Sequence, residues 1–521
     1  MAYIFLVSII TLVMKANCEE YNLQKNNQCK YWRKETLLHV DCTNKKMSTI
    51  GIFPADTAFL NLGYNCIKQI TSGAFKHSRG LVELDLSYNE ITQCDRLSFD
   101  GLHKLRRLYL NSNNLNYSLL SLPDGICKPL FSLTYLNIKD NLPDNKPNIE
   151  DIVMKDLREL ESLEIDVRKT ANEIVFGKDY SNLRNLRAIT FGLCILWHMN
   201  NYTFENLPYL EYIHATGCSI VNYKSKTLSY RKQLRFIDFS YSLTGMNDKK
   251  RFLSDMMSTG IKIVKLTNCN RTPIEFPYIF FHMLKRTGIE ELYLSNNLLS
   301  GFQDTSFPAS LHVLDFSFNH FTIFQQNLTN LSRLLLHNNT LGPYLERNTY
   351  YIFSTTSHLK HINLASNFIR SLQFNIFHHQ PLLAEIDLSH NIISEITFDL
   401  AESKNLQFLD LSGNLFRAFN ETTMNALSSM FETSGLNMSL KDNPLRCSCF
   451  SLPFLEWMLE NQDHFYSIHK YRCIFDNNTE IVFKSLGHTV LQLKRSCASF
   501  TAVIALVSVA VAVSLVVISG G

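Results

Sequence analysis

Four cysteines near the C-terminal end stand at spacings typical of metal or disulfide chemistry. Cys447 and Cys449 form a C-x-C pair, and Cys473 and Cys497 follow it at intervals of 24 residues counted from Cys449. Sets of four thiolates hold zinc, but zinc ribbons usually combine two close pairs, and this cluster has one. In an oxidising compartment the same cysteines form disulfides. The spacing therefore favours a disulfide-linked segment over a metal centre.

Catalytic chemistry finds little support in the sequence. No nucleophile elbow, H-E-x-x-H motif or G-x-G-x-x-G motif occurs in a usable context. His378 and His379 are adjacent, so their side chains diverge, and they follow Phe377 at a position typical of the surface. We predict that the protein is not an enzyme and uses no cofactor.

The secondary structure that positions these cysteines and histidines can be predicted from an internal sequence repeat. Five residues of the segment 81–115 return 24 residues later: Leu81, Leu84, Leu86, Asn89 and Ile91 recur as Leu105, Leu108, Leu110, Asn113 and Leu115. The template L-x-x-L-x-L-x-x-N-x-L matches closely from Leu81, Leu105, Ile289, Leu311, Leu331, Leu359, Leu383 and Leu406. Looser copies begin at Thr57, Leu133, Leu160, Leu186, Leu210, Leu234 and Ile261, and a degenerate one covers Met438 to Leu445. About sixteen copies of this kind are the signature of leucine-rich repeats.

The repeat predicts an α/β solenoid shaped as a horseshoe, with disulfide-capped flanks. Each L-x-L core is a short strand whose leucines share one face, and neighbouring repeats bury that face together. The asparagine amide both donates and accepts hydrogen bonds where the chain leaves the strand. Large apolar residues are expected to fill the connections, namely Phe75, Phe99, Phe204 and Phe377.

Six further cysteines fall within the repeats. Cys194, Cys218 and Cys269 occupy the asparagine position of their own repeats, where cysteine is an accepted substitute, so we interpret them as structural rather than metal-binding. Cys94 points inward and Cys127 lies on the next coil, so a Cys94–Cys127 disulfide and two separate thiols remain as alternatives. Cys66 follows an asparagine at a surface position and has no assigned partner.

The two ends predict the secretory pathway and a membrane. Residues 1–18 contain a short apolar run followed by Ala16 and Cys18, which predicts a signal peptide cut after Cys18. Residues 499–519 carry no charge and are long enough for a transmembrane helix. Removal of Cys18 leaves twelve of the thirteen cysteines, an even number. The N-glycosylation motif N-x-S/T occurs nine times, at Asn116, Asn201, Asn270, Asn327, Asn330, Asn338, Asn420, Asn437 and Asn477.

Composition limits the classes of partner. The chain of 521 residues holds 50 Lys and Arg against 47 Asp and Glu, and it has no long basic run. Such a balance does not indicate nucleic-acid binding. The sequence also shows no low-complexity segment that predicts a disordered tail.

Outward strand positions supply the candidate ligand contacts. They are Tyr109, Tyr212, His214, Phe236, Tyr293, Arg333 and His361. Exposed aromatic and arginine side chains are common energetic centres of interfaces, although each also fits a plain solvated sheet. The aspartates Asp85, Asp387 and Asp410 recur with the L-D-L-S phrase, and we interpret them as structural.

The repeats and both ends together resemble a Toll-like receptor ectodomain. The resemblance covers residues 19 to about 519 and is most specific in the segment NPLRCSC…LEWM…YRC…C before the predicted span. It implies an N-terminal cysteine cap at 19–56, repeats at 57–445 and a C-terminal cap at 446–498. It also implies disulfides Cys29–Cys42, Cys447–Cys473 and Cys449–Cys497, with Trp457 packing the short cap helix. Family members carry a cytoplasmic Toll/interleukin-1 receptor domain, which this sequence lacks, so we expect a truncated sequence or a decoy.

The resemblance implies a receptor function. We expect a single-pass protein of the plasma membrane or of endosomes, with extracellular repeats that bind a microbial or endogenous ligand. Dimerisation with a second copy, or with another leucine-rich repeat receptor, would be the signal. The alternatives are an adhesion or developmental receptor on the same scaffold, and a ligand-capturing protein held by a glycosylphosphatidylinositol (GPI) anchor attached near Ser485 to Gly487.

Overall fold

The computed structural model divides into two compact units, Met1–Cys269 and Asn270–Gly521. The residues it describes are 29–141, 151–169, 175–229, 231–243, 245–270, 282–301, 307–324, 328–347, 353, 358–378, 380–400, 403–484 and 486–498. The predicted signal peptide at 1–18, the predicted span at 499–519, Asn327 and His379 lie outside these ranges.

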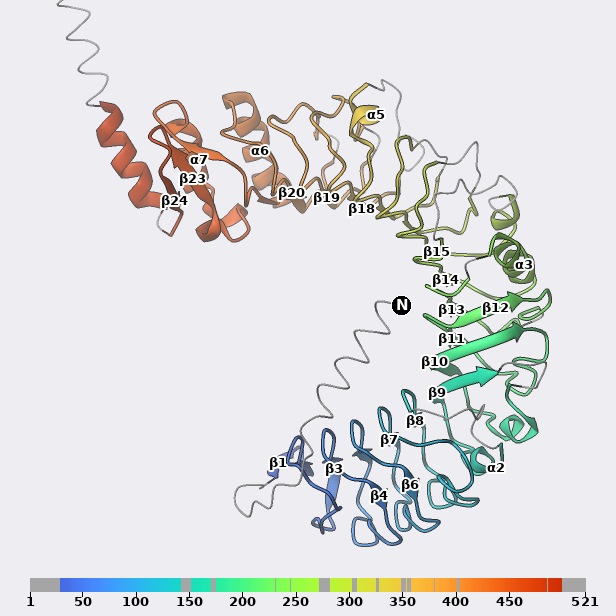
Figure 1. Cartoon of the computed structure of the whole chain (residues 1–521). Coiled ribbons are helices and arrows are strands. Elements are labelled where there is room, and N and C mark those ends of the chain that lie inside the picture. Colours follow the sequence, from blue (N-terminus) through green and yellow to red (C-terminus); the bar gives the residue numbers. More distant parts are fainter. Residues whose placement is uncertain are drawn as a thin grey trace, which may run out of the picture. The chain divides into compact units, whose positions relative to one another are not determined.

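Unit 1 is built on a ladder of parallel strands, about one per repeat (Figure 1). The ladder strands are β2 (Leu37–Asp41), β3 (Thr57–Asn61), β5 (Glu83–Asp85), β7 (Arg107–Tyr109), β8 (Tyr135–Asn137), β9 (Ser162–Lys169), β10 (Ala188–Met199), β11 (Tyr212–His214), β13 (Phe236–Asp238) and β14 (Ile263–Lys265). The first of them pairs antiparallel with β1 (Lys30–Lys34). Two short strands pair with each other away from the ladder, β4 (Gln69–Ile70) with β6 (Gln93–Cys94). Strand β12 (Ser219–Tyr223) pairs with the C-terminal half of β10.

Unit 2 repeats the same plan and ends in a small cap. Its ladder strands are β15 (Glu291–Tyr293), β16 (Val313–Asp315), β17 (Arg333–Leu335), β18 (His361–Asn363), β19 (Glu385–Asp387), β20 (Phe408–Asp410) and β21 (Asn437–Ser439). The cap sheet consists of β22 (Leu445–Cys447), β23 (Arg472–Phe475) and β24 (Glu480–Val482). These two ladders confirm the predicted α/β leucine-rich repeat fold.

Helices lie in the connections between strands. They include α2 (Asp151–Met154), α3 (Met246–Met256), α5 (Gly342–Arg347), α6 (Glu421–Ser434) and α7 (Leu452–Glu460), with 3₁₀ turns at Lys178–Asn182, Gln462–His464 and Ile468–Lys470. A further helix, over residues 486–498, follows the last strand. In unit 1, α3 lies on the side opposite the ladder strands (Figure 1). Helix α6 is capped by the Asn420 side chain, which accepts from the Thr423 amide, and by Gly435 in the left-handed conformation.

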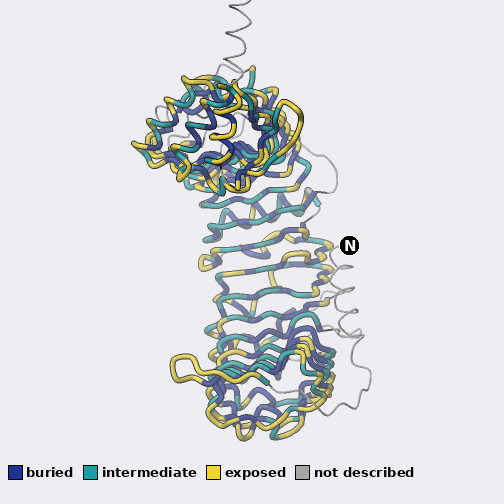
Figure 2. The backbone as a smooth tube through the Cα atoms, turned by 90° about the vertical axis from the view of Figure 1, so that its left-hand side faces the viewer, coloured by how far each residue is buried: buried dark blue, intermediate teal, exposed yellow. Residues whose placement is uncertain are grey.

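The template leucines form the core, as the repeat predicts. Leu84, Leu108 and Leu334 are at most 1% exposed, and the four phenylalanines expected in the connections are buried as well. Figure 2 shows this interior as buried segments that run along the inside of the coils. Because each leucine is covered by the repeats on both sides, the core is continuous within each unit.

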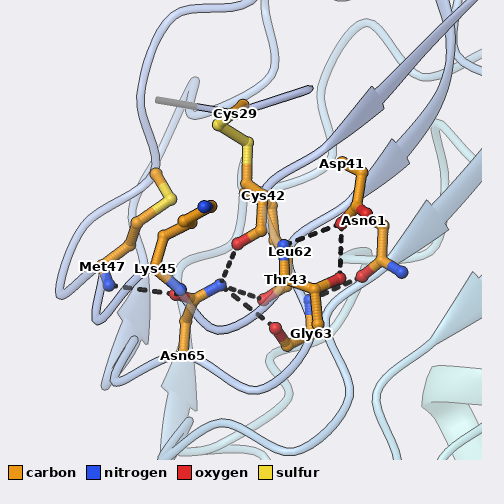
Figure 3. The surroundings of a disulfide bond; sticks show 10 residues. All are labelled: Cys29, Asp41, Cys42, Thr43, Lys45, Met47, Asn61, Leu62, Gly63 and Asn65. Atoms are coloured by element: carbon orange, nitrogen blue, oxygen red, sulfur yellow. Dashed lines mark hydrogen bonds between the residues drawn. A yellow bond between two sulfur atoms is a disulfide. The ribbon is translucent and has the colours of Figure 1, made fainter. Parts of the chain in front are cut away.

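Asparagine side chains tie neighbouring repeats together. The Asn65 amide donates to the Cys42 and Leu62 carbonyls at 2.9 Å, and its oxygen accepts from the Lys45 and Met47 amides at 2.9 and 3.0 Å (Figure 3). Asn89 repeats the pattern one repeat later, accepting from the Ile67 amide and donating to the Leu62 and Leu86 carbonyls. The prediction that the asparagine amide both donates and accepts is thus confirmed. The amide bonds to backbone groups that would otherwise be buried without partners.

Disulfides close both ends of the repeats. Cys29 bonds to Cys42 beside Asn65 (Figure 3), and in the C-terminal cap Cys447 bonds to Cys473 and Cys449 to Cys497. These are the pairings that the resemblance implies. Trp457 packs α7 against α6, because its ring stacks on Phe431 and its indole nitrogen donates to Ser428 Oγ at 2.7 Å.

The remaining cysteines differ from the sequence expectations in two places. Cys194 and Cys218 are bonded to each other, which the interpretation as simple asparagine substitutes did not include. Cys94 and Cys127, both inside the described residues, are buried thiols and not a disulfide, so that alternative is wrong. Cys66 is disulfide-bonded, and the Cys269 thiol donates to the Phe239 carbonyl at 3.3 Å.

No helix in the described part of the chain combines the length and the apolar character needed to cross a bilayer. Since residues 499–519 are not among those described, the predicted span stays a prediction.

Candidate ligand-binding faces of the repeat strands

The seven predicted contact residues all lie on ladder strands, but in two separate sets. Unit 1 carries Tyr109 on β7, Tyr212 and His214 on β11, and Phe236 on β13; unit 2 carries Tyr293 on β15, Arg333 on β17 and His361 on β18. All seven are exposed or partly exposed, as expected for the strand positions that alternate with the buried leucines. Each unit therefore presents a strand face of its own.

Tyr135 is the centre of a first cluster on the unit 1 face. Its ring lies 5.1 Å from that of Tyr109, and the Arg107 guanidinium lies 5.6 Å from its ring centroid. Its hydroxyl donates to Glu164 at 2.5 Å. Burial, helped by this hydrogen bond, raises the pKa of Tyr135 well above its usual value. Sequence reasoning missed Tyr135, although its place beside Leu136 in the looser repeat from Leu133 marks it as outward-facing.

The charges around this cluster are paired. Arg107 lies 3.8 Å from Glu83, and Lys139 lies 2.5 Å from Glu164. Two cations thus face two carboxylates, so this part of the strand face carries little net charge. Such a surface gives no strong electrostatic attraction to a polyanion.

Phe236 is the centre of a second cluster on the same face. Its ring lies 4.5 Å from the His214 ring and 6.3 Å from the Tyr212 ring, and the Lys265 ammonium lies 5.6 Å from its centroid. Burial lowers the pKa of His214, so the imidazole is neutral at physiological pH. The second cluster therefore offers aromatic surface, a neutral imidazole and one cation.

Small side chains separate the two clusters. The ladder register runs from Tyr135 through Ser162 and Ala188 to Tyr212, and the parallel row passes through Thr190 to His214. The aromatic-flanked strip, as we call it, consists of Tyr109, Tyr135, Ser162, Glu164, Ala188, Thr190, Tyr212, His214 and Phe236. Small side chains occupy its middle at Ser162, Ala188 and Thr190, and its two ends are aromatic.

The unit 2 face is dominated by hydrogen-bonded polar groups. The Tyr293 hydroxyl donates to Glu291 at 2.8 Å, and burial raises the pKa of this tyrosine to about 12. His361 lies opposite Arg333 in the ladder, and its Nδ1 is 2.7 Å from Glu385 Oε2. The face brings these three predicted residues onto one ladder, and farther along it the Phe408 ring of β20 lies edge-on to Tyr466 at 6.3 Å.

The recurring aspartates are structural, as predicted. Asp85, Asp387 and Asp410 each accept a hydrogen bond from the amide of the serine two residues later, at 2.8 to 2.9 Å. Among the described residues no group of three or more His, Cys, Asp or Glu side chains is placed to hold a metal ion. His378 lies 3.3 Å from Asp399 and stacks edge-on against Phe374.

The glycosylation motifs are distributed unevenly over the strand faces. Asn437 begins β21 and is exposed, so a glycan there would stand on the unit 2 face. The unit 1 motifs at Asn116 and Asn201 lie in exposed turns outside the ladder strands. Asn270 is 3% exposed and its amide donates to the Asn297 carbonyl, so we predict that it carries no glycan in the folded chain.

Five consecutive repeats in unit 1 lack the asparagine. The equivalent positions hold Arg168, Cys194, Cys218, Ser242 and Cys269. There β9, β10 and β12 continue as an extended sheet, whose surface exposes Leu193, Ile195, Trp197 and Val221. Sequence reasoning missed this apolar surface because the loose repeats gave no sign that their strands would be longer.

A buried carboxylate replaces part of the missing asparagine network. Asp166 is 2% exposed and accepts from the Tyr117 hydroxyl at 2.8 Å, the Asp140 amide at 2.9 Å and the Leu193 amide at 2.7 Å. The Asn141 amide adds a fourth hydrogen bond at 2.9 Å. Burial raises the pKa of Asp166 to about 6, although the four donors oppose this shift.

Comparison with known proteins agrees with the fold. The family model described as leucine rich repeat matches residues 58–115 and 353–429. A curated protein named Toll-like receptor 4 from Pinctada imbricata is 24% identical over 495 residues, which cover 88% of this chain and 54% of that protein. Mouse (Mus musculus) osteomodulin is 33% identical over 119 residues, or 22% of this chain and 27% of that protein. The chain thus spans about half the length of the Toll-like receptor it matches.

Among solved structures, the TLR13–ssRNA13 complex aligns with 17% identity and a TM-score of 0.34, covering 86% of this chain and 98% of that one. The described residues thus have a leucine-rich repeat fold with disulfides at both ends, and the chain is similar in sequence to the Pinctada imbricata Toll-like receptor 4.

Proposed function

We propose that this chain is the ligand-binding part of a pattern-recognition receptor of the Toll-like kind. It would sit in the plasma membrane through residues 499–519, bind a microbial ligand through the strand faces and dimerise. The observation that carries the proposal is the similarity to the Pinctada imbricata Toll-like receptor 4, which extends over 88% of the chain. The cap disulfides at both ends of the repeats support it.

Ligand-dependent dimerisation of the full chain tests the proposal. The chain would be produced in the secretory pathway of animal cells, purified in detergent and mixed with extracts of bacteria and fungi. Mass photometry should show a shift from one copy to two with at least one microbial extract, and no shift with an extract of the producing cells. A chain that binds no microbial material and keeps its mass throughout would contradict the proposal.

Membrane attachment is tested separately. We expect an epitope tag on the repeats to be accessible to antibody on intact cells. Attachment through residues 499–519 predicts that a lipase specific for GPI anchors leaves the tag on the cells. Release of the tag by that lipase would instead favour the anchored ligand-capturing protein.

An adhesion or matrix function on the same scaffold is the second candidate. The similarity to mouse osteomodulin favours it, although only 22% of the chain is covered. Expression restricted to development, together with no binding of microbial material, would support this candidate over the receptor.

A further inference from the structure

From the aromatic-flanked strip of unit 1 we infer that the ligand bound there is a neutral oligosaccharide. This inference rests on the proposed ligand-binding function and adds the chemical class of the ligand. It assigns the stacking contacts to Tyr135 and Tyr212, with Phe236 supporting Tyr212.

The first argument is the position of the aromatic rings. Tyr135 and Tyr212 lie three ladder steps apart, through Ser162 and Ala188. At the usual strand spacing this is about 14 Å, enough for a short run of linked sugar rings. A sugar ring has an apolar C–H face that packs on an aromatic ring, so two separated rings suit the two ends of one oligosaccharide. Tyr212 is 39% exposed and is therefore available for such packing.

The second argument is the polar middle of the strip. Between the two tyrosines lie Ser162 and Thr190, which both carry hydroxyls. Hydroxyls both donate and accept, so these two complement the hydroxyl groups around a sugar. Glu164, next to them, already accepts from the Tyr135 hydroxyl and is paired with Lys139. An acyl chain or an apolar helix face would leave the two hydroxyls without partners, which costs free energy.

Charge and topology make two other ligand classes less suitable. The cations Arg107 and Lys139 are already paired with Glu83 and Glu164, so a polyanion such as RNA would have to displace these carboxylates. A peptide that adds as a β-strand needs a free sheet edge. Strands β8 to β11 are each paired on both sides, so the strip offers no such edge.

Direct titration tests the inference. The full chain in detergent would be titrated with maltohexaose, cellohexaose and chitohexaose, and with heparin and poly(U) RNA as polyanions. At least one neutral hexasaccharide should bind, and Tyr212→Leu should weaken that binding about tenfold, while Tyr212→Phe should stay within about threefold. Leucine keeps apolar bulk and loses the ring, so this pair separates stacking from general apolar contact.

The control variant is Tyr31→Leu. Tyr31 is 54% exposed and belongs to the same unit, but it lies on β1, away from the strip. Its substitution should leave hexasaccharide binding unchanged. A second strip variant, Tyr135→Leu, should reproduce the loss seen with Tyr212→Leu and thereby locate the ligand between the two rings.

Several outcomes would overturn the inference. They are the absence of binding by all three neutral hexasaccharides at millimolar concentration, binding by heparin or poly(U) alone, and equal binding by Tyr212→Leu and the unchanged chain. If microbial extracts still cause dimerisation after digestion with glycosidases, the receptor function stands and this inference falls. If no extract causes dimerisation but a hexasaccharide binds through Tyr212, the receptor function falls and this inference stands.

Discussion

At the residue scale, a few buried polar side chains set the stability of the repeats. Asn89 bonds to four backbone groups from two repeats. Asp166 accepts from four donors in a region without the asparagine. Sequence predicted the first of these because the residue recurs with the template. It did not predict the role of Asp166. Other repeats carry a serine at the equivalent position, such as Ser87 or Ser317, and a single repeat does not show which donors will face the carboxylate.

Replacement of Asn89 by alanine should lower the free energy of unfolding of unit 1 by roughly 2–4 kcal/mol. The substitution leaves the Ile67 amide and the Leu62 and Leu86 carbonyls buried with fewer partners. Denaturant unfolding, monitored by hydrogen exchange in these repeats, would measure this decrease in the free energy of unfolding. Gln93→Ala, at an exposed position of β6, should cost less than about 0.5 kcal/mol, and an equal loss in both variants would contradict the role of Asn89.

Asp166 should make the stability of unit 1 depend on pH. Its pKa is about 6 in the folded chain against 3.8 as the ordinary value, so the folded state binds the proton first as the pH falls. Protonation of Asp166 therefore stabilises the folded state increasingly as the pH falls from about 7 to about 4. The gain in the free energy of unfolding reaches roughly 3 kcal/mol.

Thermal unfolding at pH 7.5 and pH 5.0 measures this contribution, with Asp166→Asn as the comparison. The variant cannot titrate, so it should gain less stability on acidification than the unchanged chain. It should also be less stable at both pH values, because its amide NH₂ replaces an oxygen that accepts hydrogen bonds. The same pH slope in both proteins would show that Asp166 does not titrate in this range.

At the element scale, the strand and its exit turn were predictable and the extended sheet was not. The leucine spacing predicted ladder strands around Leu84, Leu108 and Leu334, and the structure has them. The outward positions of Tyr109, Tyr212 and Phe236 followed from the same register. The Cys194–Cys218 disulfide could not be predicted from this register. The template places each cysteine within its own repeat and does not show how near the two sulfurs lie.

Loss of the Cys194–Cys218 disulfide should loosen β10 and β12. The bond joins cysteines 24 residues apart, and its removal should lower the free energy of unfolding by roughly 3 kcal/mol. In the double variant Cys194→Ser, Cys218→Ser, hydrogen exchange should rise in 188–199 and 219–223 and stay unchanged at β3 and β5. Non-reducing peptide mapping of the unchanged chain should recover the two cysteines in one linked peptide pair, and its absence would refute the bond.

At the scale of the whole molecule, the chain has two units, and two N-glycosylation motifs of the second unit differ in exposure. Asn437 is exposed on a ladder strand of unit 2, whereas Asn270 is buried at the start of that unit. The sequence motif is the same at both, so sequence alone could not separate them. Burial and the hydrogen bond to the Asn297 carbonyl separate them in the structure.

Glycopeptide mass spectrometry of the secreted chain should find Asn437 occupied and Asn270 unmodified. A glycan on Asn270 would have to displace its hydrogen bond and open the core at that repeat. Exposed Asn477 serves as the positive control for glycosylation. Full occupancy of Asn270 in folded protein would contradict the position that the structure gives it.

The run of five repeats without asparagine changes how cooperativity passes along unit 1. In a repeat protein each coil is coupled only to its neighbours, so the chain behaves as a row of linked two-state segments. Where asparagine is present, the coupling forms as soon as two neighbouring coils fold. Between the repeats that carry Cys194 and Cys218, part of the coupling is covalent and needs an oxidant. The growth of ordered structure through unit 1 is therefore linked to the redox potential of the compartment in which the chain is made.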